Sequence, residues 1–538
     1  MEENFVIDTG NKEFQDALSL IQYTSQSVFL TGKAGTGKST FLKYVCEHTK
    51  KKYVVLAPTG VSAINVGGST IHSFFKMPFR PMLPDDPDLS LAGGRIYELL
   101  KYNKKQRQLL REVELIIIDE ISMVRADMID FIDRVLRVYS GNMRFPFGGK
   151  QLLLVGDVYQ LEPVVTSDMR DILSRFYSNF YFFSARVFRE MSLVPIELQK
   201  VYRQQDERFV EVLDKIRNNT ATREELDLLN SRYLPQYEPE KDNFSITLAT
   251  RRDQVDYINE NRLSGLPGKE YTFTGTIKGD FPEGSLPTSL ELVVKTGAQV
   301  IFIKNDPERR WVNGTIGMIS DITPDEKIEV VLESGEMYEL ERCVWENIKY
   351  TYNEKEKTIE ESVLGTFLQF PIRLAWAITV HKSQGLTFER AIIDARNSFA
   401  HGQTYVALSR CKTLEGLVLE SPLRKEAIIS DSVVDNFTKE VERNKPGNKQ
   451  LSDMQKAYFF DLLSDLFNFY SLEQAYKRLL RMLDEDLYKL YPKLLTEYKL
   501  LEPHIKEKIV EVAHRFRNQY TRLINESEDY ASDQELQA

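Results

Sequence analysis

Short apolar runs alternate with amphipathic segments in the N-terminal part of the chain. Each run is rich in Val, Ile and Leu, which is typical of strands buried on both faces of a parallel sheet. The runs are Val28–Leu30, Tyr53–Ala57, Leu115–Ile118 and Gln151–Val155. Segments with helical periodicity, such as Phe41–Cys46, lie between them. Strands alternating with helices predict an α/β domain with a parallel sheet.

A second set of apolar runs predicts a second α/β domain. These runs are Phe244–Leu248, Ala375–Thr379, Ala391–Asp394 and Leu417–Leu419. Between the first and second of them, residues 269–370 hold short β-type runs with turn signals at Asn313-Gly314 and Ser334-Gly335. Hairpin signals of this kind predict a small β-barrel inserted in the second domain.

The pattern changes again after Ser421. Residues 426–450 include Asn444–Lys449, with a Pro-Gly pair, and are expected to be a linker. Residues 451–526 have helical periodicity, with a capping box at Ser471 and Gln474 and a last helix starting at Pro503. This all-α region is either a bundle packed on itself or on the other domains, or a module that docks a protein partner. The polar residues 527–538 are expected to be disordered.

Composition narrows the class of protein. A chain of 538 residues with 42% hydrophobic content can bury several cores. Its 3 cysteines are scattered, so neither a disulfide framework nor a structural zinc site is expected. No apolar run is long enough to span a bilayer and the N-terminus lacks a signal pattern, so we expect a cytoplasmic protein. The net charge of −10 argues against a protein that coats nucleic acid through overall positive charge. A local channel can still be basic.

A glycine-rich turn follows the first predicted strand and opens a helix. The sequence G-x-x-x-x-G-K-S from Gly32 to Ser39 lets backbone N–H groups converge on phosphate oxygens at a helix N-terminus. Lys38 then contacts the terminal phosphates, and the Ser39 hydroxyl binds Mg²⁺. Upstream, Gln15 is either an adenine contact or a solvated helix residue. The predicted ATP-binding residues are Gln15, Gly32, Lys33, Ala34, Gly35, Thr36, Gly37, Lys38, Ser39 and Thr40.

Two further strand ends carry the polar groups that a phosphate loop needs for hydrolysis. Asp119 and Glu120 follow Leu115–Ile118, where Asp119 is a candidate Mg²⁺ ligand and Glu120 a candidate base for the attacking water. Gln160 follows the next strand, and its amide is placed to touch both the terminal phosphate and the water. These residues predict an ATP-hydrolysing enzyme that uses ATP and Mg²⁺.

Seven strings resemble the Pif family of superfamily-one DNA helicases, in the RecD-like branch, and they stand in the same order. They are GKAGTGKST, APTGVSAINVGGSTIHSFF, DEISMV, GDVYQLEPV, VYRQ, WAITVHKSQGLTF and GQTYVALSR. Arg134, Arg137 and the run Pro146–Lys150 are also similar to the signature that separates this family from other superfamily-one members. Glu162 and the pair Arg251-Arg252 depart from the family pattern, outside the hydrolysis chemistry. The resemblance extends from Phe5 to Leu419 and does not reach the C-terminal part.

The resemblance implies two RecA-like motor domains with ATP in the cleft between them. Arg203 and Arg410 would then reach across to the terminal phosphate, as arginine fingers do. Residues assigned to single-stranded DNA by family position are Thr59, His72, Thr379, His381 and Lys382. The family also implies five-prime to three-prime movement, unwinding of forked duplexes in genome maintenance, and G-quadruplexes and RNA–DNA hybrids as further substrates. We also expect the enzyme to be a monomer.

The expected domain organisation follows from these motifs. The first motor domain covers 1–195, with a strand-separating insert at about 76–104, and the second covers 196–268 and 371–425. Residues 269–370 form the β-barrel inserted in the second domain. The C-terminal part consists of the linker at 426–450, the helical domain at 451–526 and the disordered tail at 527–538. Two other functions stay open at this stage. One is an ATP-switched protein that binds single strands without unwinding them, and the other is the motor subunit of a nuclease complex.

Overall fold

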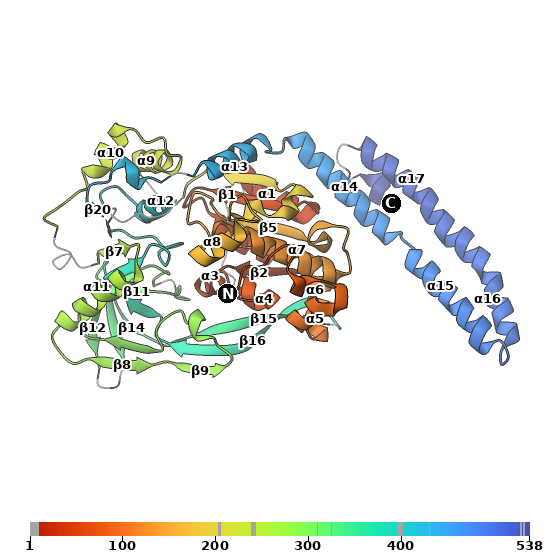
Figure 1. Ribbon diagram of the computed structural model, residues 1–538, viewed down its shortest axis with the longest axis horizontal. Coiled ribbons are helices and arrows are strands. Elements are labelled where there is room, and N and C mark those ends of the chain that lie inside the picture. The colour runs from red at the N-terminus through yellow and green to blue at the C-terminus, as the bar shows by residue number, and fades with distance from the viewer. Residues whose placement is uncertain are drawn as a thin grey trace. The chain divides into compact units, whose positions relative to one another are not determined.

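The N-terminal half of the chain is built on a parallel sheet, as seen in a computed structural model (Figure 1). The structure describes residues 10–537 except 203–205, 238–243, 309, 324, 326, 354, 357, 395–401, 430, 528–529 and 531–532. The sheet has the strand order β3-β2-β4-β5-β1-β6, and each neighbouring pair is parallel. Its strands are β1 (Val28–Gly32), β2 (Tyr53–Ala57), β3 (Ser69–Thr70), β4 (Leu115–Ile118), β5 (Gln151–Val155) and β6 (Val194–Leu198).

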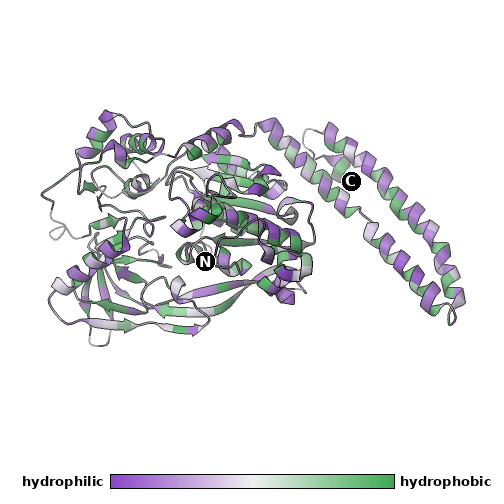
Figure 2. Cartoon of the chain, viewed as in Figure 1, coloured by the Kyte–Doolittle hydropathy of each residue, from purple (hydrophilic) through white to green (hydrophobic). Residues whose placement is uncertain are grey.

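Burial explains why these residues form strands. Every residue of β1, β4 and β5 is buried, so β-branched and leucine side chains pack on both faces of the sheet. Their apolar residues are green in Figure 2. The helices of this half are α1 (Lys12–Tyr23), α2 (Lys38–His48), α3 (Gly60–Asn65), α4 (Ile71–Phe75), α5 (Arg95–Leu100), α6 (Lys104–Glu112), α7 (Ala126–Ser140) and α8 (Ser167–Leu173). The predicted strands of this sheet are confirmed.

The predicted second sheet is present and is also parallel. It has the order β18-β7-β19-β20, with β7 (Ile246–Ala249) paired to both β18 (Ala377–Thr379) and β19 (Ala391–Ile393). The fourth strand is β20 (Leu417–Leu419), parallel to β19. The helices of this part are α9 (Glu207–Arg217), α10 (Arg223–Asn230), α11 (Arg252–Gly265) and α12 (Gln403–Leu408). Two RecA-like parallel sheets therefore form the core of the molecule.

Antiparallel strands fill the segment between β7 and β18. One five-stranded sheet has the order β14-β13-β12-β11-β17. The strands of the segment are β8 (Tyr271–Thr274), β9 (Thr276–Gly279), β10 (Glu291–Val294), β11 (Gln299–Phe302), β12 (Ile316–Ile322), β13 (Ile328–Leu332), β14 (Met337–Leu340), β15 (Cys343–Asn353), β16 (Thr358–Gln369) and β17 (Ile372–Leu374). Because β17 pairs with β11, this sheet continues beyond residue 370, where the sequence places the end of the insert.

A long hairpin of β15 and β16 reaches the first parallel sheet. Tyr350 on β15 is buried in the core of the first motor domain, and its hydroxyl accepts a hydrogen bond from the Val55 N–H of β2 at 3.3 Å. The Phe74 ring packs edge-on against it, with centroids 6.1 Å apart. The antiparallel insert is therefore anchored on the first domain, a contact that the turn signals do not predict.

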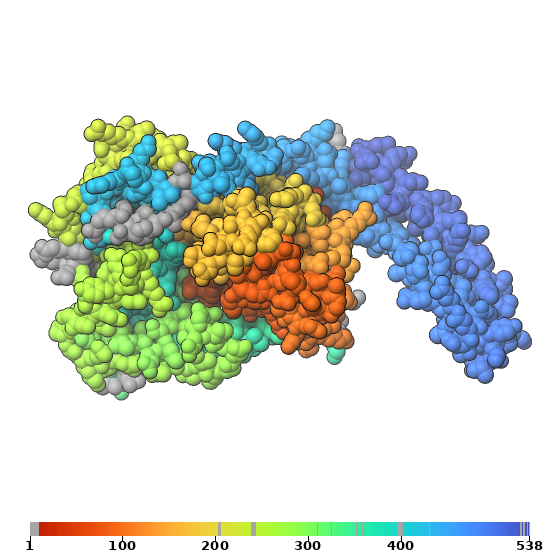
Figure 3. Space-filling view, in the orientation of Figure 1, coloured from red at the N-terminus to blue at the C-terminus, as the bar shows by residue number. Residues whose placement is uncertain are grey.

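The segment predicted as a linker contains a packed helix, α13 (Ser432–Arg443). Val434 is fully buried in the core of the first domain, and the Phe437 ring stacks on Phe183 at 4.0 Å. Tyr181 donates a hydrogen bond from its hydroxyl to Asp431 at 2.9 Å. Figure 3 shows the residues of α13, in blue, beside the yellow residues that precede β6. The linker prediction is wrong for residues 432–443, because Val434, Phe437 and Val441 give α13 an apolar face.

Residues Pro446–Ala538, together with Leu18–Gln26, form a separate compact unit. Its helices are α14 (Asn448–Leu466), α15 (Tyr470–Met482), α16 (Pro492–Ile505), α17 (Glu511–Glu526) and α18 (Gln534–Gln537). Hydrophobic and hydrophilic residues alternate along them (Figure 2). The Phe467 ring packs on Phe516 at 5.0 Å and Phe460 on Tyr520 at 5.8 Å, so α14 and α17 pack through aromatic side chains.

Three details of this unit differ from the sequence prediction. Helix α15 begins at Tyr470, so Ser471 lies inside it and does not cap it. Pro503 lies inside α16, and the chain continues as a π-helical segment, Lys506–Val510, into α17. A proline cannot donate its own helical hydrogen bond, and a wider turn accommodates that loss. Residues 534–537 form α18 where disorder is expected.

The insert at about 76–104 is ordered and packs on α7. Met82, Leu89, Ile96 and Leu100 are buried in the core of the first domain. The Met82 N–H donates to the buried Asp127 carboxylate at 3.0 Å. The insert is therefore held rigidly on the first domain. Among the described helices, none combines the length and apolar character needed to cross a bilayer.

Candidate active site and strand-contact residues

A cavity of about 330 Å³ lies between the phosphate loop and segments of the second domain. Its lining residues are Ala34, Gly35, Thr36, Gly37, Lys38, Ser39, Thr40, Asp119, Glu120, Gly156, Gln160, Tyr202, Gly385 and Arg410. The predicted phosphate, acid, amide and arginine residues are thus brought together from both parts of the chain. This placement follows from the topology, because β1, β4 and β5 are adjacent and their carboxyl ends meet at one sheet edge.

The phosphate loop has the backbone of an anion cradle. Gly35 and Gly37 have φ values of 82° and 85°, in the left-handed region that glycine tolerates. The Lys38 ammonium donates to the carbonyl oxygens of Gly32 at 2.6 Å and Lys33 at 2.9 Å. The side chain of Lys33 is instead paired with Asp214 of α9. Lys38 is therefore aimed into the loop, where terminal phosphate oxygens can replace these carbonyls.

The acid pair at the end of β4 is buried and crowded. Burial raises the pKa of Asp119 to about 6. Burial and the neighbouring Asp119 charge raise the pKa of Glu120 to about 7. The backbone of Glu120 is left-handed, with φ 51°, which for a residue other than glycine costs about 1–3 kcal/mol. Strain of this kind persists where the fold over-determines it, and it is found here directly after β4, at the residue that the sequence predicts as the base.

Gln384 of the second domain contacts Glu120 of the acid pair, although the sequence pattern does not single it out. Its side-chain amide donates to Glu120 Oε2 at 2.7 Å and lies 3.4 Å from the Gln160 side-chain oxygen. These residues are 264 and 224 positions apart in the chain. The string VHKSQG contains Gln384, but no local pattern pairs it with a strand end in another domain.

Arg410 lies at the same cavity and is 2% exposed. Its Nε donates to the Val406 carbonyl at 2.9 Å, and its Nη1 lies 3.3 Å from the carbonyls of both Ser383 and Leu386. The guanidinium thereby braces the turn that carries Gln384. Its charge also lowers the pKa of Glu120, against the larger effect of burial.

Two close approaches hold the second domain against the first. The Ala34 N–H of the phosphate loop donates to the Tyr405 hydroxyl at 3.0 Å. Gly402 lies so near the loop after β5 that a Cβ there would stand 2.1 Å from the Gln160 carbonyl oxygen. With φ 78° as well, this position admits only glycine without a shift of the loop.

A buried ion pair also joins the domains. Asp157, after β5, accepts hydrogen bonds from the Arg217 guanidinium of α9 at 3.0 and 3.3 Å. The same guanidinium lies over the Tyr159 ring, 4.4 Å from its centroid. Burial alone would raise the pKa of Asp157, but the charges of Arg217 and Lys38 hold it below its ordinary value. Asp157 is thus a charged anchor rather than a proton donor.

Replacing Arg217 is expected to destabilise the protein. Arg217→Met leaves the Asp157 carboxylate buried without its charge partner, and breaking a buried pair in this way costs about 3–5 kcal/mol. Thermal unfolding should therefore shift to lower temperature, and Asp157→Asn in the same chain should recover part of the loss. Arg223→Met is a matched control, because Arg223 pairs with Asp227 while its side chain is 94% exposed. Equal midpoints for the two single variants would contradict the anchor role.

Two predicted nucleotide-site residues have other outcomes. Gln15 is exposed on α1 and does not line the cavity, whereas Tyr202 does. The Tyr202 N–H donates to Gly35 O at 2.8 Å, and its hydroxyl lies 3.4 Å from the side-chain amide of Asn11. Tyr202 thus places an aromatic face beside the phosphate loop, which the motif VYRQ marks only by its arginine. Arg203 lies outside the described residues.

The two threonines assigned to single-stranded DNA order their own turns. The Thr59 hydroxyl accepts from the Ser62 N–H at 3.1 Å and caps α3. Thr379 is 8% exposed, and its hydroxyl accepts from the Lys382 N–H at 3.2 Å. The Thr379 hydroxyl therefore fixes the turn that carries His381 and Lys382, whereas the Thr59 hydroxyl fixes the start of α3.

The remaining three residues keep accessible side chains. His72 and His381 are partly exposed, and Lys382 is exposed. The His72 ring stacks on Phe79 with centroids 4.6 Å apart and planes 7° from parallel, while Phe79 itself is 88% exposed. An exposed aromatic ring held flat against histidine is a surface on which a base can stack. Phe79 stands at the start of the insert, and its exposure cannot be read from the sequence.

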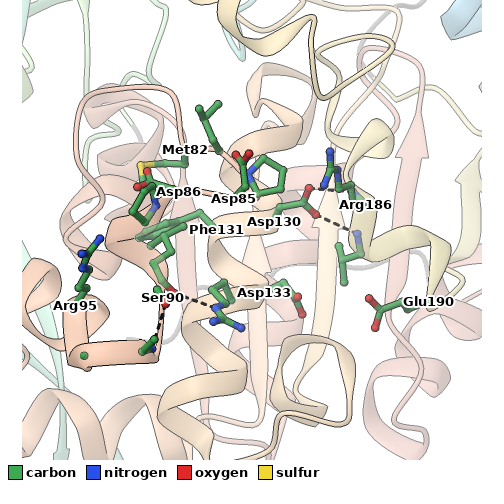
Figure 4. Close-up of a pocket in the computed structure, with 18 residues that line it drawn as sticks. Met82, Asp85, Asp86, Ser90, Arg95, Asp130, Phe131, Asp133, Arg186 and Glu190 are labelled. Atoms are coloured by element: carbon green, nitrogen blue, oxygen red, sulfur yellow. Dashed lines mark hydrogen bonds between the residues drawn. The ribbon is translucent and has the colours of Figure 1, made fainter.

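A second cavity, of about 980 Å³, lies between the insert and α7, and no residue of the phosphate loop lines it (Figure 4). Two of its acids, both on α7, are already bonded. Asp130 accepts from the N–H groups of Arg186 and Val187, both at 3.0 Å, and Asp133 accepts from Phe147 N–H at 2.6 Å. These contacts fix the turns around the insert. The carboxylates of Asp130 and Asp133 are therefore bonded to backbone N–H groups, and the cavity lacks the phosphate loop that an ATP site needs.

A phosphate loop and an acid pair on one parallel sheet, with an arginine that follows α12 in the domain of the second parallel sheet at the same cavity, define a two-domain nucleoside-triphosphate motor. A sequence model of the PIF1-like helicases matches residues 9–226, and one of the middle domain of DNA helicases matches residues 450–538. The Pif1 helicase of Bdellovibrio bacteriovorus is 31% identical over 438 residues, which are 80% of this chain and 92% of that protein. This chain belongs to the PIF1-like helicase family.

Solved structures agree. Bacteroides Pif1 in complex with ADP-AlF4 is 41% identical, with a TM-score of 0.74 over 80% of this chain and 97% of that chain. The same relative bound to single-stranded DNA has a TM-score of 0.58 at the same identity and coverage. The family resemblance in the seven motif strings and the two-domain fold are thereby confirmed.

Proposed function

We propose that this protein is an ATP-dependent DNA helicase that moves from five-prime to three-prime along a single strand and separates the duplex ahead of it. One observation supports this above all: Glu120 and Gln160 of one motor domain and Gln384 and Arg410 of the other meet at one cavity beside Lys38. A site completed from two domains can use hydrolysis to open and close the cleft. The helicase names and DNA complexes of the relatives point the same way.

Each residue of the ATP site has a separate role in hydrolysis. The amides of the phosphate loop and the Lys38 ammonium hold the phosphates of ATP. Glu120 takes the proton of the attacking water, Gln160 orients that water, and Arg410 neutralises charge that develops on the terminal phosphoryl group. Arg203 remains a second finger by sequence alone. Ser39 and Asp119 present a hydroxyl and a carboxylate at the same cavity, which are oxygen ligands of the kind Mg²⁺ prefers. When bound, the ion neutralises phosphate charge.

The strand is gripped through groups without sequence preference. His72, His381 and Lys382 contact the single strand, Thr379 fixes the turn that presents His381 and Lys382, Thr59 contributes from the start of α3, and the insert beginning at Phe79 meets the duplex. The domain boundaries expected from the motifs remain part of this proposal, with 371–374 moved to the antiparallel insert and 432–443 to the first domain. The protein acts as a monomer on single-stranded and forked DNA.

A forked duplex with a five-prime single-stranded tail tests the proposal. We expect ATP-dependent release of the labelled strand, no release from a fork with only a three-prime tail, and none with Lys38→Ala. Gel or fluorescence assays of strand release give the result. Binding of the fork with ATP hydrolysis but no strand release would favour a single-strand switch over a helicase. Release from the three-prime tail alone would reverse the assigned polarity.

A further inference from the structure

We propose that Gln384 is the positioning residue through which a bound DNA strand controls the general base Glu120. The inference rests on the proposed function and extends it to a residue that the motif analysis does not assign. Two observations carry it: the amide of Gln384 holds the Glu120 carboxylate across the cleft, and the same short turn presents His381 and Lys382 to the solvent.

The turn is rigid enough to transmit a displacement. Ser383 N–H donates to the Thr379 carbonyl at 3.0 Å, and Leu386 N–H donates to the Ser383 carbonyl at 3.0 Å. The buried Ser383 hydroxyl donates to the Val380 carbonyl at 2.8 Å. With Arg410 on the carbonyls of Ser383 and Leu386, residues 379–386 form one hydrogen-bonded block that follows β18. A strand bound along residues 379–382 therefore moves Gln384, and the Lys382 side chain is only one of its contacts.

At the ATP site, the Gln384 amide contacts one particular oxygen of the Glu120 carboxylate. Gln384 donates to Oε2 of Glu120, so one carboxylate oxygen is held in place and the direction of the other is set by that bond. Glu120 sits at a strained backbone position at the end of β4, where a small change in the donor redirects the carboxylate. The Gln160 oxygen, 3.4 Å from the same amide, is oriented with it. One amide thus sets both residues that face the attacking water.

The test measures how strongly single-stranded DNA stimulates ATP hydrolysis. In Gln384→Met the side chain keeps its length without a donor, and in Gln384→Glu it keeps its shape but presents an acceptor to Glu120. For both variants we expect the ratio of the DNA-saturated to the DNA-free kcat to fall at least tenfold toward one. The KM for ATP and the Kd for a labelled oligonucleotide should stay within twofold of the wild-type values.

Lys382→Ala separates strand contact from coupling. It should raise the Kd for the oligonucleotide, yet at saturating DNA it should keep most of the stimulation, because Gln384 is intact. Both glutamine variants keep the length of the side chain, so a role in packing alone would leave the stimulation ratio unchanged, and that result overturns the inference. If the wild-type protein itself shows no stimulation by DNA, the proposed function fails instead.

Discussion

Glu120→Gln is expected to lower the kcat of ATP hydrolysis by about two to four orders of magnitude, the usual contribution of a general base. The amide keeps the size of the side chain at its strained position but cannot accept the proton of the attacking water. The phosphate loop is untouched, so ATP should bind with near wild-type affinity. Removing one of two crowded carboxylates even relieves their mutual repulsion, which burial intensifies.

Hydrolysis and nucleotide affinity are measured separately to check this result, by phosphate release and by titration with a fluorescent ATP analogue. Lys38→Ala provides the contrast, because it should lose both affinity and turnover. Glu112→Gln is a matched control on α6, where Glu112 pairs with Lys52 outside the cavity. Wild-type turnover in Glu120→Gln would remove Glu120 from the role of base and leave the chemistry to Asp119 or to a water chain.

Much of the first motor domain is predictable because its signals are local. Strands β2, β4 and β5 have the bounds that the apolar runs predict, since all of their residues except the half-buried Tyr53 are buried. The carboxyl ends of parallel strands meet at one edge, so the chemistry of Asp119 and Gln160 could also be placed there from sequence. The glycine spacing of the phosphate loop is enough to predict that Lys38 lies at the ATP site.

The contacts across the cleft could not be predicted, because they join residues far apart in the chain. Gln384 and Glu120 are 264 positions apart, and Asp157 and Arg217 are 60 apart. The polar composition of residues 426–450 hides α13, because Asp435 and Asn436 separate Val434 from Phe437, and both apolar residues find their partners only in the first domain. Pro503 predicts a helix start because proline is common at the first helical position, and the wider turn that accommodates it within a helix has no sequence signature of its own.

Arg410→Ala is expected to lower the kcat of ATP hydrolysis by about three to five orders of magnitude, the range for arginine fingers. The Arg410 guanidinium lines the cavity of the phosphate loop. Its charge becomes available to the terminal phosphoryl group when Nη1 gives up its long hydrogen bonds to the carbonyls of Ser383 and Leu386. Those contacts are 3.3 Å long, and a phosphate oxygen competes well with them. Affinity for single-stranded DNA should remain.

Arg410→Lys distinguishes chemistry from bracing. Lysine keeps the positive charge but lacks the planar fork that reaches two carbonyls and a phosphate together, so we expect it to recover only a small part of the lost rate. Thermal unfolding and oligonucleotide binding report on the turn that Arg410 braces. If Arg410→Ala keeps its fold and DNA affinity but hydrolyses ATP at the wild-type rate, Arg410 only braces the turn, and Arg203 would be the finger to test next.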